Sequence, residues 1–260
     1  MYGQVCGLFC IKNSFYTDFN FLLHHWVFQV SVLVLRQDCP CSWRNDNRSW
    51  TCKSEEPTAV PTHCWDIHED VRIIEFGGNI PVIRRHDLDH ENLLNAQILK
   101  LNYVSFVEHD ALRHLTQLTY LDIMYGNITQ VPDLTHQTLV TSLDFSYNQL
   151  TEGPSLPFQV HLRYVGLHHN NIERLPDDFL PASDGSIGMP MVHNNLTELN
   201  ATSILRAPAN SSFTFDVDLL KVVWATAEER DTLVARTYFC NVDLLSIVQL
   251  IDDPVTPESF

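Results

Sequence analysis

Four cysteines stand close together near the beginning of the chain, at Cys39, Cys41, Cys52 and Cys64. Thiols in such a cluster either pair as disulfides or bind zinc as thiolates, here with His63 or His68 as a further ligand. The last three cysteines are separated by ten and eleven residues, which lacks the paired CxxC spacing of zinc ribbons. We therefore predict disulfide bonds, for which four cysteines allow three pairings. Disulfides persist in oxidising compartments, so the chain should be exported.

The chain carries none of the common local signatures of catalysis: HExxH, GxSxG, P-loop and GxGxxG motifs are all missing. His168 and His169 could act as a catalytic or pH-sensing pair, but no partnered nucleophile accompanies them. His86 and His90 are four residues apart, a spacing that can bind metal on a helix, but an exposed turn explains this acidic segment better. We predict that the protein is not an enzyme and has no cofactor or bound metal.

Candidate glycosylation sites are spread along the chain. Five N-x-S/T triplets without a central proline begin at Asn47, Asn127, Asn195, Asn200 and Asn210. This is a mild excess over chance, and three of the five lie between 195 and 210. Since a glycan needs an exposed asparagine, we expect that segment on an outer or lateral surface. The triplets favour an extracellular glycoprotein.

The elements that position these residues are predicted by a repeat. The pattern LxxLxLxxNxL, with other apolar residues allowed at the L positions, returns every 22 to 25 residues, most clearly in Leu118–Ile128, Val140–Leu150 and Leu162–Ile172. A unit of this size cannot bury its own apolar edge and must stack on its neighbours. The alternative, an ordinary α/β domain with chance matches, does not explain a register kept over seven copies. The fourth position of the pattern falls at Ile74, Leu99, Leu121, Leu143, Val165, Met189 and Phe213.

Each unit is predicted to contain one short strand. Its fourth and sixth positions, such as Leu143 and Phe145, alternate with polar residues and therefore point to one side of the strand. The predicted fold is an α/β repeat: a curved leucine-rich repeat solenoid with short parallel strands on its concave face and mostly irregular or short helical outer segments. Asparagine at the ninth position can hydrogen-bond the backbone and form a ladder, as at Asn79, Asn148, Asn170 and Asn194.

The same register predicts which side chains share the concave face, because residues at equal positions become neighbours across adjacent strands. The eighth position forms what we name the aromatic column: Tyr103, Tyr125, Tyr147, His169 and His193. Beside it lie the third-, fifth- and seventh-position residues Tyr120, Asp122, Asp144, Tyr164 and His168. Tyrosine clusters give large, rigid contact area in protein recognition, so both sets are candidate ligand-binding residues. The alternative is that ring stacking merely stiffens the sheet.

Repeat, cysteine cluster and glycosylation triplets together resemble an extracellular leucine-rich repeat protein over about residues 39–220. The cysteine block resembles the cysteine-rich N-terminal flank that covers the first repeat of such proteins. The chain is similar to Toll-type receptor ectodomains and to the secreted leucine-rich immune proteins of insects. The resemblance implies disulfides from the first to the third and from the second to the fourth cysteine, that is Cys39–Cys52 and Cys41–Cys64.

We predict a chain of four segments. Residues 1–37 form a leader whose apolar run Phe19–Leu35 suits a signal peptide or an uncleaved anchor, unless it is irrelevant to export. Residues 38–70 form the cysteine-rich cap, 71–220 the leucine-rich repeats, and 221–260 a degenerate last repeat and acidic tail. In the last segment, Cys240 is either a buried thiol or an intermolecular disulfide partner.

The net charge of −16 and the pI near 5.0 argue against nucleic acid, heparin or an anionic membrane as a partner. We predict an extracellular recognition module, secreted or on the extracellular face of the plasma membrane. It would bind a protein or glycoprotein through the concave face, as a receptor in innate immunity or in cell adhesion. The alternative is a structural or assembly subunit, or a truncated receptor, that associates with another leucine-rich repeat protein, with Cys240 as a candidate bridge.

Overall fold

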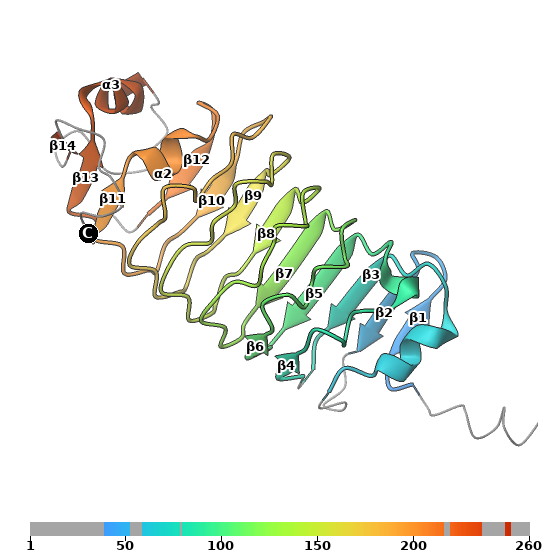
Figure 1. The fold of residues 1–260 in the computed structure, drawn as a ribbon. Coiled ribbons are helices and arrows are strands. Elements are labelled where there is room, and N and C mark those ends of the chain that lie inside the picture. The colour runs from blue at the N-terminus through green and yellow to red at the C-terminus, as the bar shows by residue number, and fades with distance from the viewer. Residues whose placement is uncertain (1–38, 53–58, 79, 216–218, 236–247, 251–260) are drawn as a thin grey trace, which may run out of the picture. The chain divides into compact units, whose positions relative to one another are not determined.

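The computed structural model describes residues 39–52, 59–78, 80–215, 219–235 and 248–250 (Figure 1). Within these ranges nine of the strands lie side by side in one sheet. In spatial order the sheet contains β1 (Ser42–Arg44), β2 (Ser49–Cys52), β3 (Ile73–Phe76), β5 (Ile98–Asn102), β7 (Tyr120–Met124), β8 (Ser142–Asp144), β9 (Tyr164–Gly166), β10 (Gly188–Pro190) and β12 (Ser212–Thr214).

The connecting segments are mostly irregular, with short elements of their own. Strands β4 (Val82–Ile83) and β6 (Phe106–Val107) pair with each other, as do β11 (Glu198–Asn200), β13 (Val222–Ala225) and β14 (Val248–Leu250). The helical elements are η1 (Thr62–Ile67), η2 (Glu91–Leu93), α2 (Thr202–Leu205) and α3 (Ala227–Ala235). None of the helices in the described ranges has the length and apolarity needed to cross a membrane.

The repeat register predicted from the sequence is confirmed. From β2 onward, neighbouring strands of the large sheet run parallel, and the fourth-position residues pair directly: Ile74 with Leu99, Leu121 with Leu143, Leu143 with Val165, and Met189 with Phe213. All seven of these side chains are buried. Because side chains alternate along a strand, one side of the sheet faces the core and the other is free for the polar positions. We name the second side the sheet face; it is the predicted concave face.

The asparagine ladder is confirmed at Asn148, Asn170 and Asn194, whereas Asn79 lies outside the described residues. The amide nitrogen of Asn148, for example, donates to the carbonyl oxygens of Ile123 (2.7 Å) and Phe145 (3.0 Å). Each amide thus ties its own turn to the preceding one and satisfies backbone groups that are buried where the strand ends.

Gly126 interrupts the ladder for a steric reason. A Cβ atom at this position would lie 2.0 Å from the carbonyl oxygen of Val104, and 2.9 Å from the side-chain oxygen of Asn148. Only glycine leaves room for that close approach of backbone segments. The missing asparagine is therefore replaced by direct packing of two neighbouring turns.

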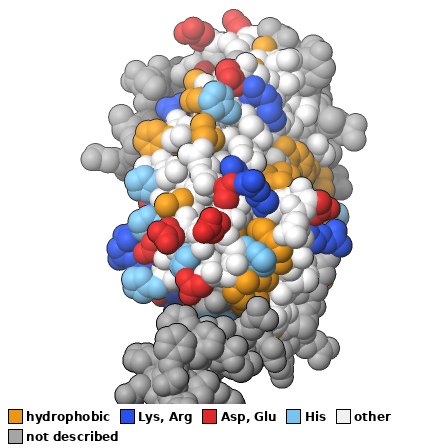
Figure 2. All heavy atoms as spheres, turned by 90° about the vertical axis from the view of Figure 1, so that its right-hand side faces the viewer, with side chains coloured by type: hydrophobic (Ala, Val, Ile, Leu, Met, Phe, Trp, Pro, Cys, Tyr) orange, Lys and Arg blue, Asp and Glu red, His pale blue; other side chains and the backbone are white. Residues whose placement is uncertain are grey.

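The cysteine-rich block covers the first repeat, as predicted. Its hairpin β1–β2 is antiparallel, and β2 then pairs in parallel with β3 so that Trp50 stands beside Ile74. Trp50 and Trp65 are buried and meet edge to face, with Trp65 also against Phe76. Figure 2 views the molecule from the end at which β1 lies, and shows charged and histidine side chains interspersed with small groups of hydrophobic ones. The stack therefore presents a mixed surface here instead of an apolar edge.

The predicted disulfides form, but the pairing implied by the family resemblance is wrong. Cys41 is bonded to Cys52 and Cys39 to Cys64, with Cα–Cα distances of 4.3 and 5.6 Å. The hairpin explains this nested pairing: Ser42 stands opposite Thr51, so the next pair along the hairpin is Cys41 and Cys52. With all four thiols oxidised, the block provides no thiolates for zinc.

Several predictions concern residues that the structure does not describe. The leader 1–37, Cys240 and the acidic end of the tail lie outside the described residues.

Four of the five candidate glycosylation asparagines are exposed: Asn47, Asn127, Asn195 and Asn210. The fifth, Asn200, is half-buried, and its amide donates to Asp177 Oδ1 (2.9 Å). Glycosylation at these five positions stays a prediction.

Candidate ligand-binding face

The aromatic column is a continuous stack of rings along the end of the strands. Consecutive ring centroids from Tyr103 to His193 are 5.9, 4.7, 4.4 and 4.2 Å apart, with nearly parallel ring planes. The tyrosines remain exposed, with 59% of Tyr103, 47% of Tyr125 and 37% of Tyr147 accessible. His168, one position earlier in the repeat, meets Tyr147 edge-on at 4.9 Å. The residues that the repeat register placed together are thus in contact.

The backbone of the column is left-handed at every position. The φ angles of Tyr103, Tyr125, Tyr147, His169 and His193 lie between 55° and 66°, a region that residues with a Cβ rarely adopt. Each such residue costs about 1 to 2 kcal/mol relative to ordinary backbone. The turn sends the chain from the strand into the core, where the ninth-position asparagine bonds.

Two interactions hold this conformation. The backbone N–H of Tyr147 donates to the carbonyl of His168 in the next repeat (3.0 Å), and that of His169 donates to Val192 (3.0 Å). The ring stack adds about 0.5 to 1.5 kcal/mol for each contact. The column is therefore preorganised by both the backbone ladder and the rings themselves.

Beside the column, four side chains on β7, β8 and β9 form what we name the Tyr–Asp cluster: Tyr120, Asp122, Asp144 and Tyr164. The Tyr164 hydroxyl donates to Asp144 Oδ2 over 3.4 Å, and Asp144 Oδ1 accepts the Ser146 N–H over 2.9 Å. Asp122, in contrast, is only 8% exposed, and its Oδ1 has no hydrogen-bond partner within the described residues.

The packing around Asp144 depends on a glycine in the neighbouring strand. Gly166 is the register partner of Asp144, and a Cβ atom there would lie 2.5 Å from Asp144 Oδ1. On the other side of the cluster, Lys100 Nζ lies 3.2 Å from Glu75 Oε1 and 5.7 Å from the centre of the Tyr120 ring. The sheet face thus carries a neutralised Glu75–Lys100 pair next to two carboxylates.

Burial shifts the protonation of the cluster. Burial raises the pKa of Asp122 to about 6; the Tyr120 hydrogen bond and Lys100 oppose this rise, and the Asp144 charge adds to it. Burial and the neighbouring carboxylates raise the pKa values of Tyr120 and Tyr164 to about 12. Burial also lowers the pKa of His168. At neutral pH the cluster therefore combines two carboxylates with two neutral tyrosine hydroxyls.

We expect Asp122→Asn to stabilise the protein at neutral pH. The folded pKa of Asp122 is raised from 3.8 to about 6, so between these values the folded state keeps a proton that the unfolded chain releases. The contribution of this group to stability is fully present below about pH 4, and is lost as the pH rises through about 6. The loss is about 1 to 3 kcal/mol at pH 7. Urea unfolding at pH 4.5 and pH 7 measures it.

The matched control for that experiment is Asp177→Asn, because Asp177 is exposed on an outer segment. This control should keep the pH dependence of the parent protein, whereas Asp122→Asn should flatten it. An unchanged pH dependence in Asp122→Asn would assign the titration to another group.

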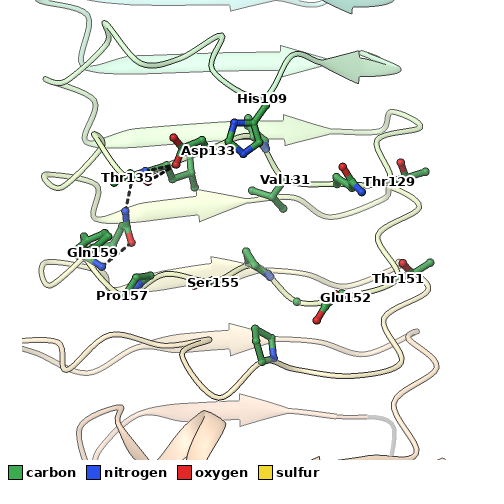
Figure 3. A pocket seen from close by; sticks show the side chains of 17 residues that line it. His109, Thr129, Val131, Asp133, Thr135, Thr151, Glu152, Ser155, Pro157 and Gln159 are labelled. Atoms are coloured by element: carbon green, nitrogen blue, oxygen red, sulfur yellow. Dashed lines mark hydrogen bonds between the residues drawn. The ribbon is translucent and has the colours of Figure 1, made fainter. Parts of the chain in front are cut away.

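A second concave region lies on the other side of the repeats. It is a polar pocket of about 660 Å³, formed by the segments that follow β7 and β8 together with His109 and Pro176 (Figure 3). Although partial burial opposes it, the pKa of Asp133 is held below its ordinary value by hydrogen bonds from the Thr135 hydroxyl and N–H. Gln159 lies in its wall and donates to the Leu134 carbonyl (2.7 Å). No sequence motif pointed to this pocket, because its residues come from irregular segments.

In the acidic segment 86–90, His90 and Asp89 each pair with a side chain of a neighbouring turn. His90 Nε2 is 3.0 Å from Asp66 Oδ1, and Asp89 Oδ1 is 3.3 Å from the ring of His114 in the next repeat. These pairs link neighbouring turns on exposed outer segments. They support the interpretation of this segment as an exposed turn.

The stacked parallel strands, the asparagine ladder and the disulfide-bonded cap define the class: the chain is a leucine-rich repeat protein with a cysteine-rich N-terminal flank. Among solved structures it is similar to the Drosophila Toll–Spatzle complex, with a TM-score of 0.51 and 18% identity over 77% of this chain. The match spans 29% of that other chain. At this identity the similarity establishes the fold.

Two further solved structures align with this chain at lower scores. The TLR13–ssRNA13 complex has a TM-score of 0.49 and 15% identity; the alignment covers 77% of this chain and 42% of the other chain. Human 5T4 (Wnt-activated inhibitory factor 1, trophoblast glycoprotein) has a TM-score of 0.43 and 15% identity; the alignment covers 82% of this chain and 89% of the other chain. No protein-family model and no curated protein matches the sequence.

Proposed function

We propose that this protein is an extracellular recognition module, which binds a protein or glycoprotein through its sheet face, in innate immunity or cell adhesion. The observation that carries the proposal is the aromatic column: five left-handed residues hold a ladder of rings, and all five residues are exposed to solvent. Rigid tyrosines offer contact area that loses little conformational entropy on binding. The Toll structure of similar fold was solved with its partner Spatzle bound, which is in keeping with recognition on this scaffold.

The exposure of the column favours recognition over simple stiffening. Rings that served only to stiffen the sheet would gain most by being covered, yet Tyr103, Tyr125 and Tyr147 are all exposed. The disulfide-bonded cap and the five glycosylation triplets support placement in the secretory pathway, with the module secreted or held at the extracellular face of the plasma membrane.

The test begins with recovery of a partner by pull-down from the extracellular fluid of the source organism, followed by mass spectrometry. We expect Tyr125→Ala/Tyr147→Ala to weaken binding to that partner at least about tenfold, or 1.4 kcal/mol, because central aromatic side chains carry most interface affinity. Surface plasmon resonance measures the change, and circular dichroism should show that the double variant is folded.

The matched control is Asp177→Ala, on an outer segment, which should leave binding unchanged. The opposite result, in which the folded double tyrosine variant binds like the parent while Asp177→Ala loses binding, would overturn the assignment. It would favour the alternative of an assembly subunit that contacts another leucine-rich repeat protein through its outer segments.

A further inference from the structure

Asp122 is an unusual residue for the exposed side of a sheet. Its neighbours in the strand, Leu121 and Ile123, point into the core, so its own side chain points to the sheet face. It is nevertheless nine-tenths buried; the Tyr120 hydroxyl hydrogen-bonds its carboxylate, but Oδ1 has no hydrogen-bond partner within the described residues. A buried carboxylate oxygen without a donor costs free energy that a ligand could recover.

A second carboxylate adjoins it. Asp144 is the register partner of Asp122 on the adjacent strand β8, and strands in a sheet are about 4.8 Å apart. Lys100, the register partner on the opposite side, is engaged with Glu75. Its charge is therefore shared, and the two aspartates remain without a full counter-charge.

Two tyrosine rings flank the aspartates. Tyr120 precedes Asp122 on β7 by two residues, and Tyr164 on β9 donates its hydroxyl to Asp144. The Tyr120 ring already lies within cation–π range of Lys100 Nζ, at 5.7 Å. The Tyr120 ring is therefore placed where it can attract a cation on the sheet face.

We propose that the Tyr–Asp cluster binds the guanidinium group of an arginine side chain on a partner protein. This inference rests on the proposed function of the sheet face and names the chemistry recognised there. A guanidinium is planar, offers five N–H donors and stacks on aromatic rings, so it can bridge two neighbouring carboxylates between tyrosines. A lysine ammonium is a compact, strongly hydrated charge without that geometry.

The surrounding charges suit such a ligand. Glu75 and Lys100 neutralise each other on one side of the cluster, and on the other side burial lowers the pKa of His168 against the opposing charge of Asp144. Tyr120 and Tyr164 are uncharged, since burial raises the pKa of each to about 12. The negative charge facing a ligand at neutral pH therefore comes from Asp122 and Asp144.

The experiment titrates the full chain with three capped probes: N-acetyl-arginine amide, its citrulline analogue and its lysine analogue, followed by ligand-observed NMR. We expect arginine to bind saturably and at least about tenfold more tightly than citrulline or lysine. Asp122→Asn and Asp144→Asn should each weaken arginine binding at least about tenfold. Because Asp122 has a raised pKa of about 6, binding to the parent protein should also weaken as the pH falls from 7 to 5.

The control variant is Glu173→Gln, which removes one carboxylate from an exposed outer position and should leave binding unchanged. The proposal is overturned if citrulline or lysine binds as tightly as arginine, or if both aspartate variants keep the affinity of the parent while folded. Free arginine and a peptide with one internal arginine should compete for the same site, with the peptide favoured.

The outcomes separate this proposal from the broader one. If Tyr125→Ala/Tyr147→Ala weakens binding of the recovered partner but the aspartate variants do not, the sheet face recognises its partner without the arginine contact. If the probes bind to the cluster but the partner binds an outer segment, the guanidinium site stands and the proposed function fails.

Discussion

Leu143→Asp should abolish the cooperative unfolding transition of the purified protein or prevent its export. The Leu143 side chain is fully buried between Leu121 and Val165 of the adjacent strands. Truncating such a leucine costs about 2 to 5 kcal/mol, and an unpaired buried charge adds several more. The sum is comparable to the whole stability of a typical domain, about 5 to 15 kcal/mol. Denaturant unfolding followed by circular dichroism measures the effect.

The neighbouring residue provides the control. Asp144 points to the sheet face, so Asp144→Ala removes hydrogen bonds from Tyr164 and Ser146 without exposing any core. We expect a change of about 1 kcal/mol, partly offset by relief of repulsion with Asp122. Comparable destabilisation by the two changes would contradict the strand register.

The strands and the members of the aromatic column could be predicted because one periodicity determines both. A stacked repeat must bury the same positions in every turn, so the buried pair Leu143 and Phe145 sets the register of each neighbouring strand. Any residue at a fixed offset then lies beside its equivalents. Tyr103, Tyr125 and Tyr147 were therefore predicted to be neighbours, and their rings are in contact.

Other features depend on geometry that a repeat pattern does not contain. The left-handed backbone of the column occurs at Tyr and His, although Gly and Asn are the usual signals for positive φ. The raised pKa of Asp122 depends on its burial in the sheet, on the Tyr120 hydrogen bond and on the charges of its register partners Asp144 and Lys100. The outer pocket is built from irregular segments, whose conformation follows no period.

The disulfide pairing likewise depends on local geometry that the sequence pattern does not contain. Spacing alone left three connectivities open, and the family resemblance favoured a crossed one. The outcome depends on the hairpin β1–β2, which places Cys41 against Cys52 and leaves Cys39 to reach Cys64 beyond it. The hairpin itself has only three and four residues in its strands, too few for a periodic signal.

We expect each cap disulfide to contribute about 3 kcal/mol to stability, with the longer Cys39–Cys64 loop of 25 residues contributing slightly more than the Cys41–Cys52 loop of 11. A double-mutant cycle tests the pairing as well as the magnitude. Cys41→Ala/Cys52→Ala removes one bond, so it should cost about as much as Cys41→Ala alone. Cys41→Ala/Cys64→Ala removes both bonds and should cost about twice as much, because the two bridges act separately.

Urea unfolding of the oxidised variants gives the free energies, and peptide mapping without reduction identifies the surviving bond in each single variant. If Cys41→Ala/Cys64→Ala instead costs no more stability than Cys41→Ala alone, those two cysteines share one bond, and the crossed pairing Cys39–Cys52 and Cys41–Cys64 is correct. Equal and small costs for all variants would mean that packing of Trp50 and Trp65 holds the cap without covalent help. The nested pairing predicts neither result. The Cys41–Cys52 bond links the two strands of the hairpin, whereas the Cys39–Cys64 bond links the residue before the hairpin to η1. Each bond therefore restrains a different part of the cap, and losing either one should destabilise the cover of the first repeat.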